Sequence, residues 1–375
     1  MSRPLRFTVA NALGLATAAS VTRAVADDGS MNYMHSFGPA AGPVLRLNWG
    51  LMTISIVVCV IISGLVLLGI FRKRPALKAD SAGRLPVGPA RGGMAWLYVG
   101  LAISTLVLFG SAIWTILTLS AVAAPRDTAR LTLEVTSHQW WWEVRYLSDV
   151  PTQAFTTANE IHIPVGEPIR VRLVGGDVIH SFWIPQLAGK TDMIPGQINF
   201  TWLQADQAGS YRGQCGEYCG AQHAHMAMHV IAEDKNRFEA WRREQLADAV
   251  SPDPGGVPVS HSTAVQGPRT ALSRPMPKAP APPDSRPLYG AEVFMTRCKD
   301  CHAVRGTPAR GHLGPDLTHV MSRRMIASGM LVNNTGNLSG WVANAQALKP
   351  GSRMPAMDLT PQDLHAVVDY LQTLH

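Results

Sequence analysis

The sequence predicts a chain of three parts: a hairpin of two transmembrane helices, an all-β sandwich and a small all-α domain at the C-terminus. Two uncharged apolar runs, 47–70 and 92–125, can each supply the roughly 20 residues that span a bilayer. Segments that alternate apolar and polar residues follow, which is the period of half-buried strands. A stretch with ten prolines, 252–287, then separates the sandwich from a last region of under 100 residues.

The N-terminal segment, residues 1–26, resembles a secretory signal peptide. Arg3 and Arg6 precede a mildly apolar run, 7–21, and a small-residue cleavage site stands at 24–26. A disordered N-terminal tail is the alternative. We expect residues 1–26 to be removed from the exported protein.

The two apolar runs form the expected membrane hairpin, 44–124, with helices at about 47–71 and 94–119. The loop between them, 72–91, holds six basic residues and one acidic residue, and basic loops stay in the cytoplasm. Both ends of the chain then lie on the periplasmic or outer side of a bacterial plasma membrane. Buried core helices are the alternative, but two runs without a charge argue against them. We expect Cys59, inside the first run, to be a buried apolar residue without chemistry.

The next part, 126–247, has the pattern of a β sandwich. Three segments, 130–137, 160–165 and 167–174, alternate apolar and polar residues, and Gly and Pro clusters separate them. This pattern predicts an antiparallel sandwich or barrel. The segment 236–247 predicts a closing helix.

A proline-rich linker, 248–286, precedes the C-terminal domain, 287–375. The end of this domain predicts a helix, because Thr360 can cap the first turn, Pro361 fits the first helical position and Asp363 favours the positive end. Its apolar face consists of Leu364, Val367, Val368 and Leu371.

A dense group of sulfur and imidazole side chains lies in the stretch QCGEYCGAQHAHMAMH. Cys215, Cys219, His223 and Met226 follow one another at spacings of four, four and three. Thiolate, imidazole and thioether are soft ligands that together select copper. Two cysteines rather than one indicate two copper ions bridged by both sulfurs. The obvious further ligand is His180, at the end of a strand-like segment.

Three other sites could use the same residues. In an oxidising compartment Cys215 and Cys219 could form a disulfide. They could bind zinc, although methionine is a poor zinc ligand and the spacing is unusual for zinc. They could belong to a Cys-x-x-x-Cys copper chaperone, but such chaperones place the distant histidine after the cysteines, whereas His180 precedes them.

A second cofactor site is indicated by Cys298-x-x-Cys301-His302, the attachment signature of c-type haem. Both cysteines would form thioethers to the haem, and His302 would be one axial ligand. Chance and half of a zinc ribbon are the alternatives, but an exported domain of this size favours haem. Met354 is the expected second axial ligand, with Met357 as its rival, and a methionine–histidine pair raises the haem potential.

From Met94 onward the chain resembles subunit II of haem–copper cytochrome c oxidases. Three segments carry the resemblance, in the same order: HQWWWEVRY, DVIHSFWIPQLAGKTDMIPG and GQCGEYCGAQHAHM. It covers both membrane helices and the sandwich, and it implies a cupredoxin fold. The C-terminal domain, with GPDLTHV and LKPGSRMPAMDL, resembles a class I cytochrome c.

The resemblance implies roles for single residues. The carboxylate of Glu217 would bind magnesium at the contact with subunit I, and Trp140 matches an exposed tryptophan proposed to receive electrons. His138, Trp141, Trp142, His225, Met228 and His229 are expected to be structural. The family has a binuclear copper centre called CuA. By resemblance, Cys215 and Cys219 would bridge the two copper ions, and His180 and His223 would each supply one ring nitrogen. Met226 would be a weak ligand, and Glu217 would supply its backbone carbonyl.

The combined resemblance implies an electron-transfer subunit II of a haem–copper terminal oxidase. Electrons would pass from a cytochrome c or a cytochrome bc-type donor to haem c, then to CuA, and then to subunit I, where cytochrome-c oxidase reduces oxygen to water. The expected partners are subunit I, the other oxidase subunits and membrane lipid, with no nucleic acid and no catalytic residue in this chain. No acidic residue lies between Asp80 and Asp127, so no proton-carrying role is assigned. The electron-input subunit of a nitric oxide reductase is the alternative, and a membrane-anchored copper chaperone fits less well.

The two exported domains differ in charge. Residues 126–247 contain eleven Lys and Arg against fourteen Asp and Glu, whereas 287–375 contain eight against six. Opposite net charges predict that the haem domain docks transiently near Trp140, on an acidic face that includes Glu143, Asp149 and Asp177. Salt should weaken this contact.

Overall fold

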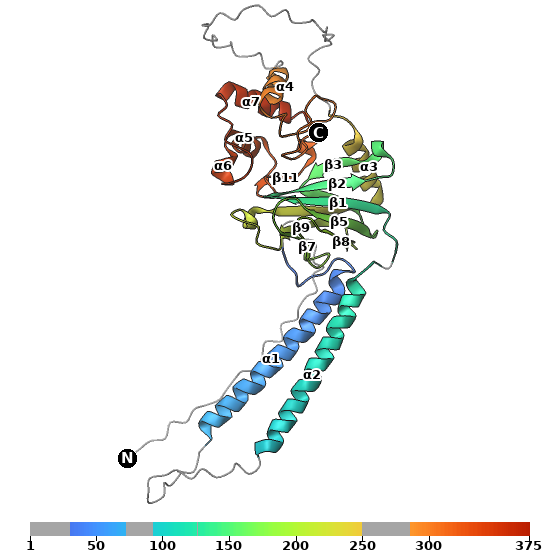
Figure 1. Ribbon diagram of the computed structural model, residues 1–375, viewed down its shortest axis with the longest axis vertical. Helices are drawn as coiled ribbons and strands as arrows, with labels where there is room; N and C mark the ends of the chain where they lie inside the picture. Colours follow the sequence, from blue (N-terminus) through green and yellow to red (C-terminus); the bar gives the residue numbers. More distant parts are fainter. Residues whose placement is uncertain (1–30, 73–92, 126, 250–285) are drawn as a thin grey trace, which may run out of the picture.

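The computed structural model describes residues 31–72, 93–125, 127–249 and 286–375. Figure 1 shows a long pair of helices that leads into the β sandwich, with the C-terminal helical domain against the far side of that sandwich. The predicted signal peptide, the predicted cytoplasmic loop and most of the proline-rich linker lie outside the described residues.

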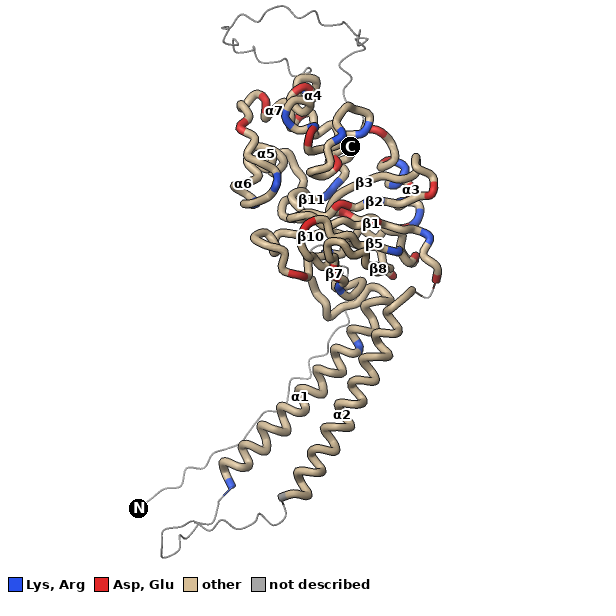
Figure 2. Tube along the Cα trace, in the orientation of Figure 1, with Lys and Arg blue, Asp and Glu red and all other residues tan. Residues whose placement is uncertain are grey.

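The helical hairpin consists of α1 (Ala41–Phe71) and α2 (Gly93–Val122), which lie side by side. Figure 2 shows almost no charged residue along either helix, in contrast to the two domains. The mean hydropathy reaches 3.0 in α1 and 1.9 in α2, and both helices are long and apolar enough to cross a membrane. Cys59 is exposed on α1 and not buried within the protein as predicted, because the second helix covers only one side of the first.

The sandwich consists of two five-stranded sheets with the orders β3-β2-β1-β5-β8 and β4-β10-β9-β6-β7. The prediction that all strands are antiparallel is wrong, because β1 pairs with β5, and β4 with β10, in parallel. The strands are β1 (Leu131–His138), β2 (Trp141–Leu147), β3 (Phe155–Ala158), β4 (Glu160–Pro164), β5 (Ile169–Gly175), β6 (His180–Trp183), β7 (Thr191–Met193), β8 (Ile198–Leu203), β9 (Gly209–Cys215) and β10 (Ala227–Glu233).

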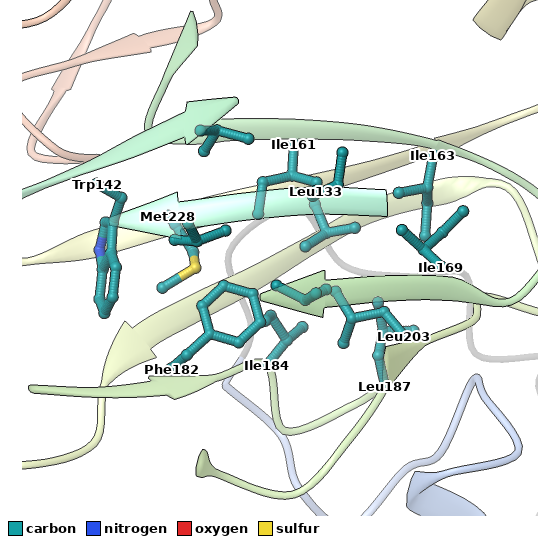
Figure 3. Packing of buried hydrophobic residues seen from close by; sticks show 14 of the residues in the cluster. Leu133, Trp142, Ile161, Ile163, Ile169, Phe182, Ile184, Leu187, Leu203 and Met228 are labelled. Atoms are coloured by element: carbon teal, nitrogen blue, oxygen red, sulfur yellow. The ribbon is translucent and has the colours of Figure 1, made fainter. Parts of the chain in front are cut away.

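The core of the sandwich fills the space between the two sheets (Figure 3). Leu133 and Trp142 from one sheet and Ile161 and Phe182 from the other have no more than a trace of exposed surface. Burial of such side chains stabilises each by roughly 1.5–3 kcal/mol relative to the exposed state. The helix α3 (Lys235–Leu246) closes the domain, and the side chain of Asp234 caps it by accepting a hydrogen bond from the backbone of Arg237.

The C-terminal domain is a small helical fold in which α4 packs on α7. The predicted cap is confirmed, because the Thr360 hydroxyl accepts a hydrogen bond from the Asp363 N–H. The fold is all-α except for a pair of two-residue strands. Its helices are α4 (Arg286–Arg297), α5 (Thr335–Ala343), α6 (Ala345–Leu348) and α7 (Pro361–Leu371), and its strands are β11 (Met325–Ile326) and β12 (Leu331–Val332). Short 3-10 turns occur in the sandwich at Pro151–Gln153 and His223–His225, and in this domain at Val320–Ser322.

Candidate metal centre and cofactor pocket

The candidate metal centre is a buried group of sulfur and nitrogen atoms at one end of the sandwich. Cys215 ends β9, Cys219 follows in the next loop, and His180 begins the neighbouring strand β6. The ligand atoms of these three residues lie within 4.8 Å of one another. Both cysteines are free, with their sulfurs 3.8 Å apart, so the thiols are available to a metal and no disulfide joins them.

The remaining predicted copper ligands surround the same two sulfurs. His223 Nδ1 lies 3.7 Å and Met226 Sδ 3.8 Å from the sulfur of Cys219. The backbone oxygen of Glu217 lies 3.2 Å from the sulfur of Cys215. The loop between β9 and β10 therefore brings every predicted ligand except His180 together by itself. A donor set of two thiols, two imidazoles and a thioether fits copper better than zinc.

The pKa values of the two thiols differ strongly. The hydrogen bond between the two sulfurs lowers the pKa of Cys215 far below its usual value, and hydrogen bonds with the His180 side chain and with the backbone of Ser181 and Glu217 lower it further. The same hydrogen bond, together with burial, raises the pKa of Cys219. The pair therefore offers one thiolate before any metal arrives, and the thiolate is the form that binds metal.

Asp177 orients His180. The ring Nε2 donates to Asp177 Oδ1 at 2.8 Å, while Nδ1 lies 3.8 Å from the sulfur of Cys215. Burial alone would raise the pKa of Asp177, but the hydrogen bonds from His180 and from the N–H groups of Gln139 and Val178 lower it to about 2. A carboxylate of this kind fixes the tautomer of a ligating histidine and strengthens it as a ligand. From the sequence, Asp177 is expected on an acidic docking face and not as a support for His180, although its position three residues before His180 was a usable signal.

The side chain of Glu217 lies partly at the surface. Its carboxylate is 45% exposed and lies 4.0 Å from Lys190 Nζ. Among the described residues, Glu217 is in no group of side chains that could by itself hold a metal ion. The predicted magnesium ion would need ligands from another subunit, and it stays a prediction.

The candidate haem pocket is a cavity of about 280 Å³ that opens between the two domains. Cys298, Cys301 and His302 line it, and Met354 lines it as well. The His302 ring donates from Nδ1 to the Pro315 carbonyl at 2.7 Å, which leaves Nε2 for a metal. Burial lowers the pKa of His302, which favours the neutral, metal-binding form.

Gly314 holds the His302 ring from one face. A side-chain carbon at this position would lie 2.6 Å from the imidazole, so only glycine permits this close packing. The residues of the cavity fit a covalently bound haem, since they provide two thiols, an oriented imidazole and a thioether in an otherwise largely apolar pocket. Met357 lines the same cavity, so the choice of Met354 as the axial ligand stays a prediction.

Trp140 lies between the two candidate cofactor sites. It is only 8% exposed, so the prediction of an exposed tryptophan is wrong for this chain. The C-terminal domain covers it: Gly351, at a φ of 81°, would place a side chain 3.5 Å from the indole. The indole N–H donates to the Cys219 carbonyl at 3.0 Å, and the residue also lines the haem pocket.

The neighbouring aromatic and histidine residues lie outside the ligand group. Trp142 is in the core, and Trp141 stacks on His138 at a centroid distance of 4.5 Å. The His225 ring bonds to the Gln222 side chain, at 2.7 Å. Met228 and His229 are buried in β10.

The contact between the domains includes buried polar groups. Glu160, in β4, accepts the backbone N–H groups of Arg324 and Met325 at 2.6 and 3.0 Å. Ser328 donates to the Ala227 carbonyl at 2.9 Å. Lys349 donates to carbonyl oxygens of both domains. Burial lowers its pKa to about 7, whereas three carbonyl acceptors match the three protons of its charged form.

Two family models match separate parts of the chain. Residues 147–233 match the periplasmic domain of cytochrome c oxidase subunit II, and residues 288–375 match cytochrome c. The first match covers the sandwich from β3 to β10, which includes the sulfur group, and the second covers the domain that holds the candidate haem pocket.

Curated relatives carry the same description. The chain is 35% identical over 244 residues to "Cytochrome c oxidase subunit 2" of Alkalihalophilus pseudofirmus, covering 64% of this chain and 60% of that protein. It is 29% identical over 260 residues to the protein of the same name from Bacillus sp. strain PS3, covering 66% and 64%. The chain thus spans about three fifths of the length of these relatives.

A solved structure is also similar to one part of the chain. The crystal structure of the periplasmic domain of subunit II of cytochrome oxidase (CoxB) of Bradyrhizobium japonicum is 33% identical, covering 32% of this chain and 95% of that one, with a TM-score of 0.30. Together with the family models, the relatives confirm the resemblance that the sequence motifs indicate. Residues 147–233 are thus similar to the periplasmic domain of cytochrome c oxidase subunit II, and residues 288–375 are similar to cytochrome c.

Proposed function

We propose that this chain is the electron-transfer subunit of a haem–copper terminal oxidase and carries both a haem c and a binuclear copper centre of the CuA type. The observation that carries the proposal is that one residue, Trp140, contacts both the candidate haem pocket and the candidate copper site. Trp140 lines the haem pocket and bonds to the carbonyl of Cys219, a candidate copper ligand.

The residues of the sandwich would hold two copper ions. Cys215 and Cys219 would bridge them, and Asp177 would keep His180 in the ligating orientation. The other ligands would be His223, Met226 and the backbone oxygen of Glu217. Burial of Cys215, Cys219, Met226 and His180 limits the access of water to the two sulfurs.

The residues of the C-terminal domain would hold the haem. Cys298 and Cys301 would attach it, and His302 and Met354 would be the ligands of its iron. When bound, the haem and the copper pair supply the one-electron chemistry that amino-acid side chains lack. The protein positions the two sites and packs Trp140 between them.

The proposed path runs from an external donor to the haem pocket, through the Trp140 contact to the sulfur group, and on to subunit I, where oxygen is reduced. A cytochrome c or a cytochrome bc-type complex is the proposed donor. The hairpin of α1 and α2 would anchor the chain in the plasma membrane beside the other oxidase subunits, with both cofactor domains on the periplasmic side. A magnesium ion at Glu217 would belong to the contact with subunit I.

The first test of this function is the cofactor content of the purified full-length chain. We expect two copper ions per chain, one covalent haem, and absorption bands of haem c and of a mixed-valence copper pair in the same sample. A chain that binds zinc or a single copper, or that lacks covalent haem after expression with haem-maturation factors, would contradict the proposal.

The second test separates oxygen from nitric oxide as the final acceptor. The complex purified through this chain should consume oxygen with reduced cytochrome c as donor. Consumption of nitric oxide without oxygen uptake would instead favour a nitric oxide reductase.

A further inference from the structure

The unusual group at the contact between the domains is the ammonium of Lys349. Lys349 follows α6 in the C-terminal domain and is only 2% exposed. Its Nζ donates to the Trp140 carbonyl at 2.7 Å, the His225 carbonyl at 2.8 Å and the Ala327 carbonyl at 3.2 Å. Two of these acceptors belong to the sandwich and one to the C-terminal domain. No carboxylate among the described residues bonds to the ammonium.

A buried ammonium without a paired carboxylate carries a large desolvation free energy, which makes it an unfavourable group for joining two domains. Removal of an ammonium from water costs free energy that carbonyl dipoles offset only in part. The same contact contains less costly bonds, such as the one from Ser328 to the Ala227 carbonyl and the one from Gln222 to the Pro350 carbonyl. Adhesion of the domains therefore does not by itself explain a lysine at this position.

The location of Lys349 relates it to both candidate cofactor sites. His225 lies in the copper-ligand loop between His223 and Met226. Trp140 donates its indole N–H to the Cys219 carbonyl while its own carbonyl binds the lysine. The side chain of Lys349 also lines the haem pocket, together with Met354.

We propose that Lys349 is a positioning residue for electron transfer between the two cofactors: its ammonium fixes the haem domain against the copper-ligand loop, and its charge favours the reduced state of both sites. The inference rests on the function proposed above. In this step one electron leaves the reduced haem iron and arrives at the oxidised copper pair, and no bond forms or breaks. A positive charge in a site shielded from water stabilises an added electron more strongly than an exposed charge does.

The experiment compares two substitutions of Lys349 in the full-length, cofactor-loaded chain. Lys349→Met removes the charge and the hydrogen bonds, while Lys349→Gln removes the charge but keeps two N–H donors. Arg286→Met is the control, because it removes a positive charge from an exposed ion pair with Asp369 in the same domain. Redox titration gives the midpoint potential of each site, and photoreduction of the haem gives the rate of copper reduction.

We expect both Lys349 variants to lower the midpoint potentials of haem and copper, and Arg286→Met to leave them unchanged. Lys349→Met should also slow copper reduction by about tenfold, and Lys349→Gln by less, since each 1.4 kcal/mol in the barrier changes a rate tenfold. Loss of copper from Lys349→Met with the haem retained would also support the proposal, because it would show that the lysine holds the ligand loop.

Unchanged potentials and an unchanged rate in fully loaded Lys349→Met would overturn this inference while leaving the proposed function intact. If Lys349→Met changes the rate but Lys349→Gln changes neither potential, the claim about charge is wrong. Failure of the unmodified chain to bind haem and two copper ions would instead overturn the proposed function.

Discussion

Cys215 and Cys219 approach different nitrogen ligands, yet their sulfurs lie only 3.8 Å apart. This arrangement suits two copper ions that share both sulfurs. We therefore expect Cys215→Ser to abolish the binuclear centre, and Met226→Leu to keep two copper ions while changing their electronic balance, because an axial thioether is a weak, tuning ligand. Metal analysis and electron paramagnetic resonance measure both effects. Retention of two copper ions and the unaltered spectrum in Cys215→Ser would refute the bridging role.

Single substitutions can also test whether Met354 or Met357 is the proposed second ligand of the haem iron. Met354 and Met357 both line the pocket. We expect Met354→Ala to remove the thioether–iron absorption band and lower the haem potential, since methionine opposite histidine raises it. Met357→Ala serves as the matched variant and should keep the band. The reverse result would make Met357 the ligand.

The sequence could predict that most of the candidate copper ligands lie close together, because they fall within one stretch of twelve positions where a single loop must bring them together. Lys349 could not be assigned in the same way. Lys349 reaches the sandwich across 209 positions, and nothing in its local sequence indicates the carbonyl groups it meets. The exposure of Trp140 was mispredicted for the same reason, since a distant domain covers it.

At the scale of elements, β4, β10 and α3 meet around a buried histidine. His162, in β4, lies 3.2 Å from the Glu233 carboxylate and 4.0 Å from that of Glu160, and its ring stacks on Trp241. Burial alone would lower the pKa of His162, but the hydrogen bonds and charges of the two carboxylates raise it. The hydrogen bond to His162 lowers the pKa of Glu233. Arg324 and Arg237 are the nearby cations, and they act on Glu233.

The directions of these two pKa shifts define the pH range in which the interaction between His162 and Glu233 stabilises the fold. A raised pKa of His162 gives stability that is fully present below its unfolded value of about 6.5 and is lost as pH rises through the folded value. The lowered pKa of Glu233 gives stability that is present above about 4.3 and is lost as pH falls through its folded value. The contribution should therefore be greatest between about pH 4.5 and 6.5.

We expect His162→Gln to lower the free energy of unfolding by about 1.5–3 kcal/mol at pH 5.5, the range for hydrogen bonds to charged groups. The loss should shrink as pH rises above 7. Chemical denaturation of the detergent-solubilised chain at several pH values measures it. Glu167→Gln is the control, because Glu167 pairs with the exposed Lys235 and should change stability by less than about 1 kcal/mol. A loss that is independent of pH would refute the charged bridge.

The strands of the sandwich were predictable where one face is buried, as in β1, whose side chains alternate between buried and half-buried. Their pairing was not, because β1 and β5 are parallel neighbours joined through intervening strands. Alternation reports which face of a strand is buried, and it carries no information on the direction of the neighbouring strand. The terminal helix α7 was predicted closely because its cap and its proline mark its start.

At the scale of the whole molecule, the C-terminal domain lies against the sandwich at Trp140, which is the region where docking is expected from the opposite charges of the two domains. The contact itself is different from the expected exposed attraction. One exposed ion pair of this kind joins Arg353 to Asp177 at 3.4 Å. The other polar contacts named above involve buried groups, namely Glu160, Ser328 and Lys349. Salt screens exposed pairs far more than buried ones, so the contact should depend only weakly on ionic strength.

The central claim is that electrons pass from the haem to the copper centre within one chain, through the contact at Trp140. The most direct test is flash photoreduction of the haem in the full-length, cofactor-loaded chain, followed by the copper absorption, with Trp140→Leu as the comparison variant. We predict a single exponential whose rate is independent of protein concentration, changes little across a salt series, and falls by more than about tenfold in Trp140→Leu. A copper-reduction rate that rises with protein concentration, or that stays the same in Trp140→Leu with both cofactors retained, would contradict the account.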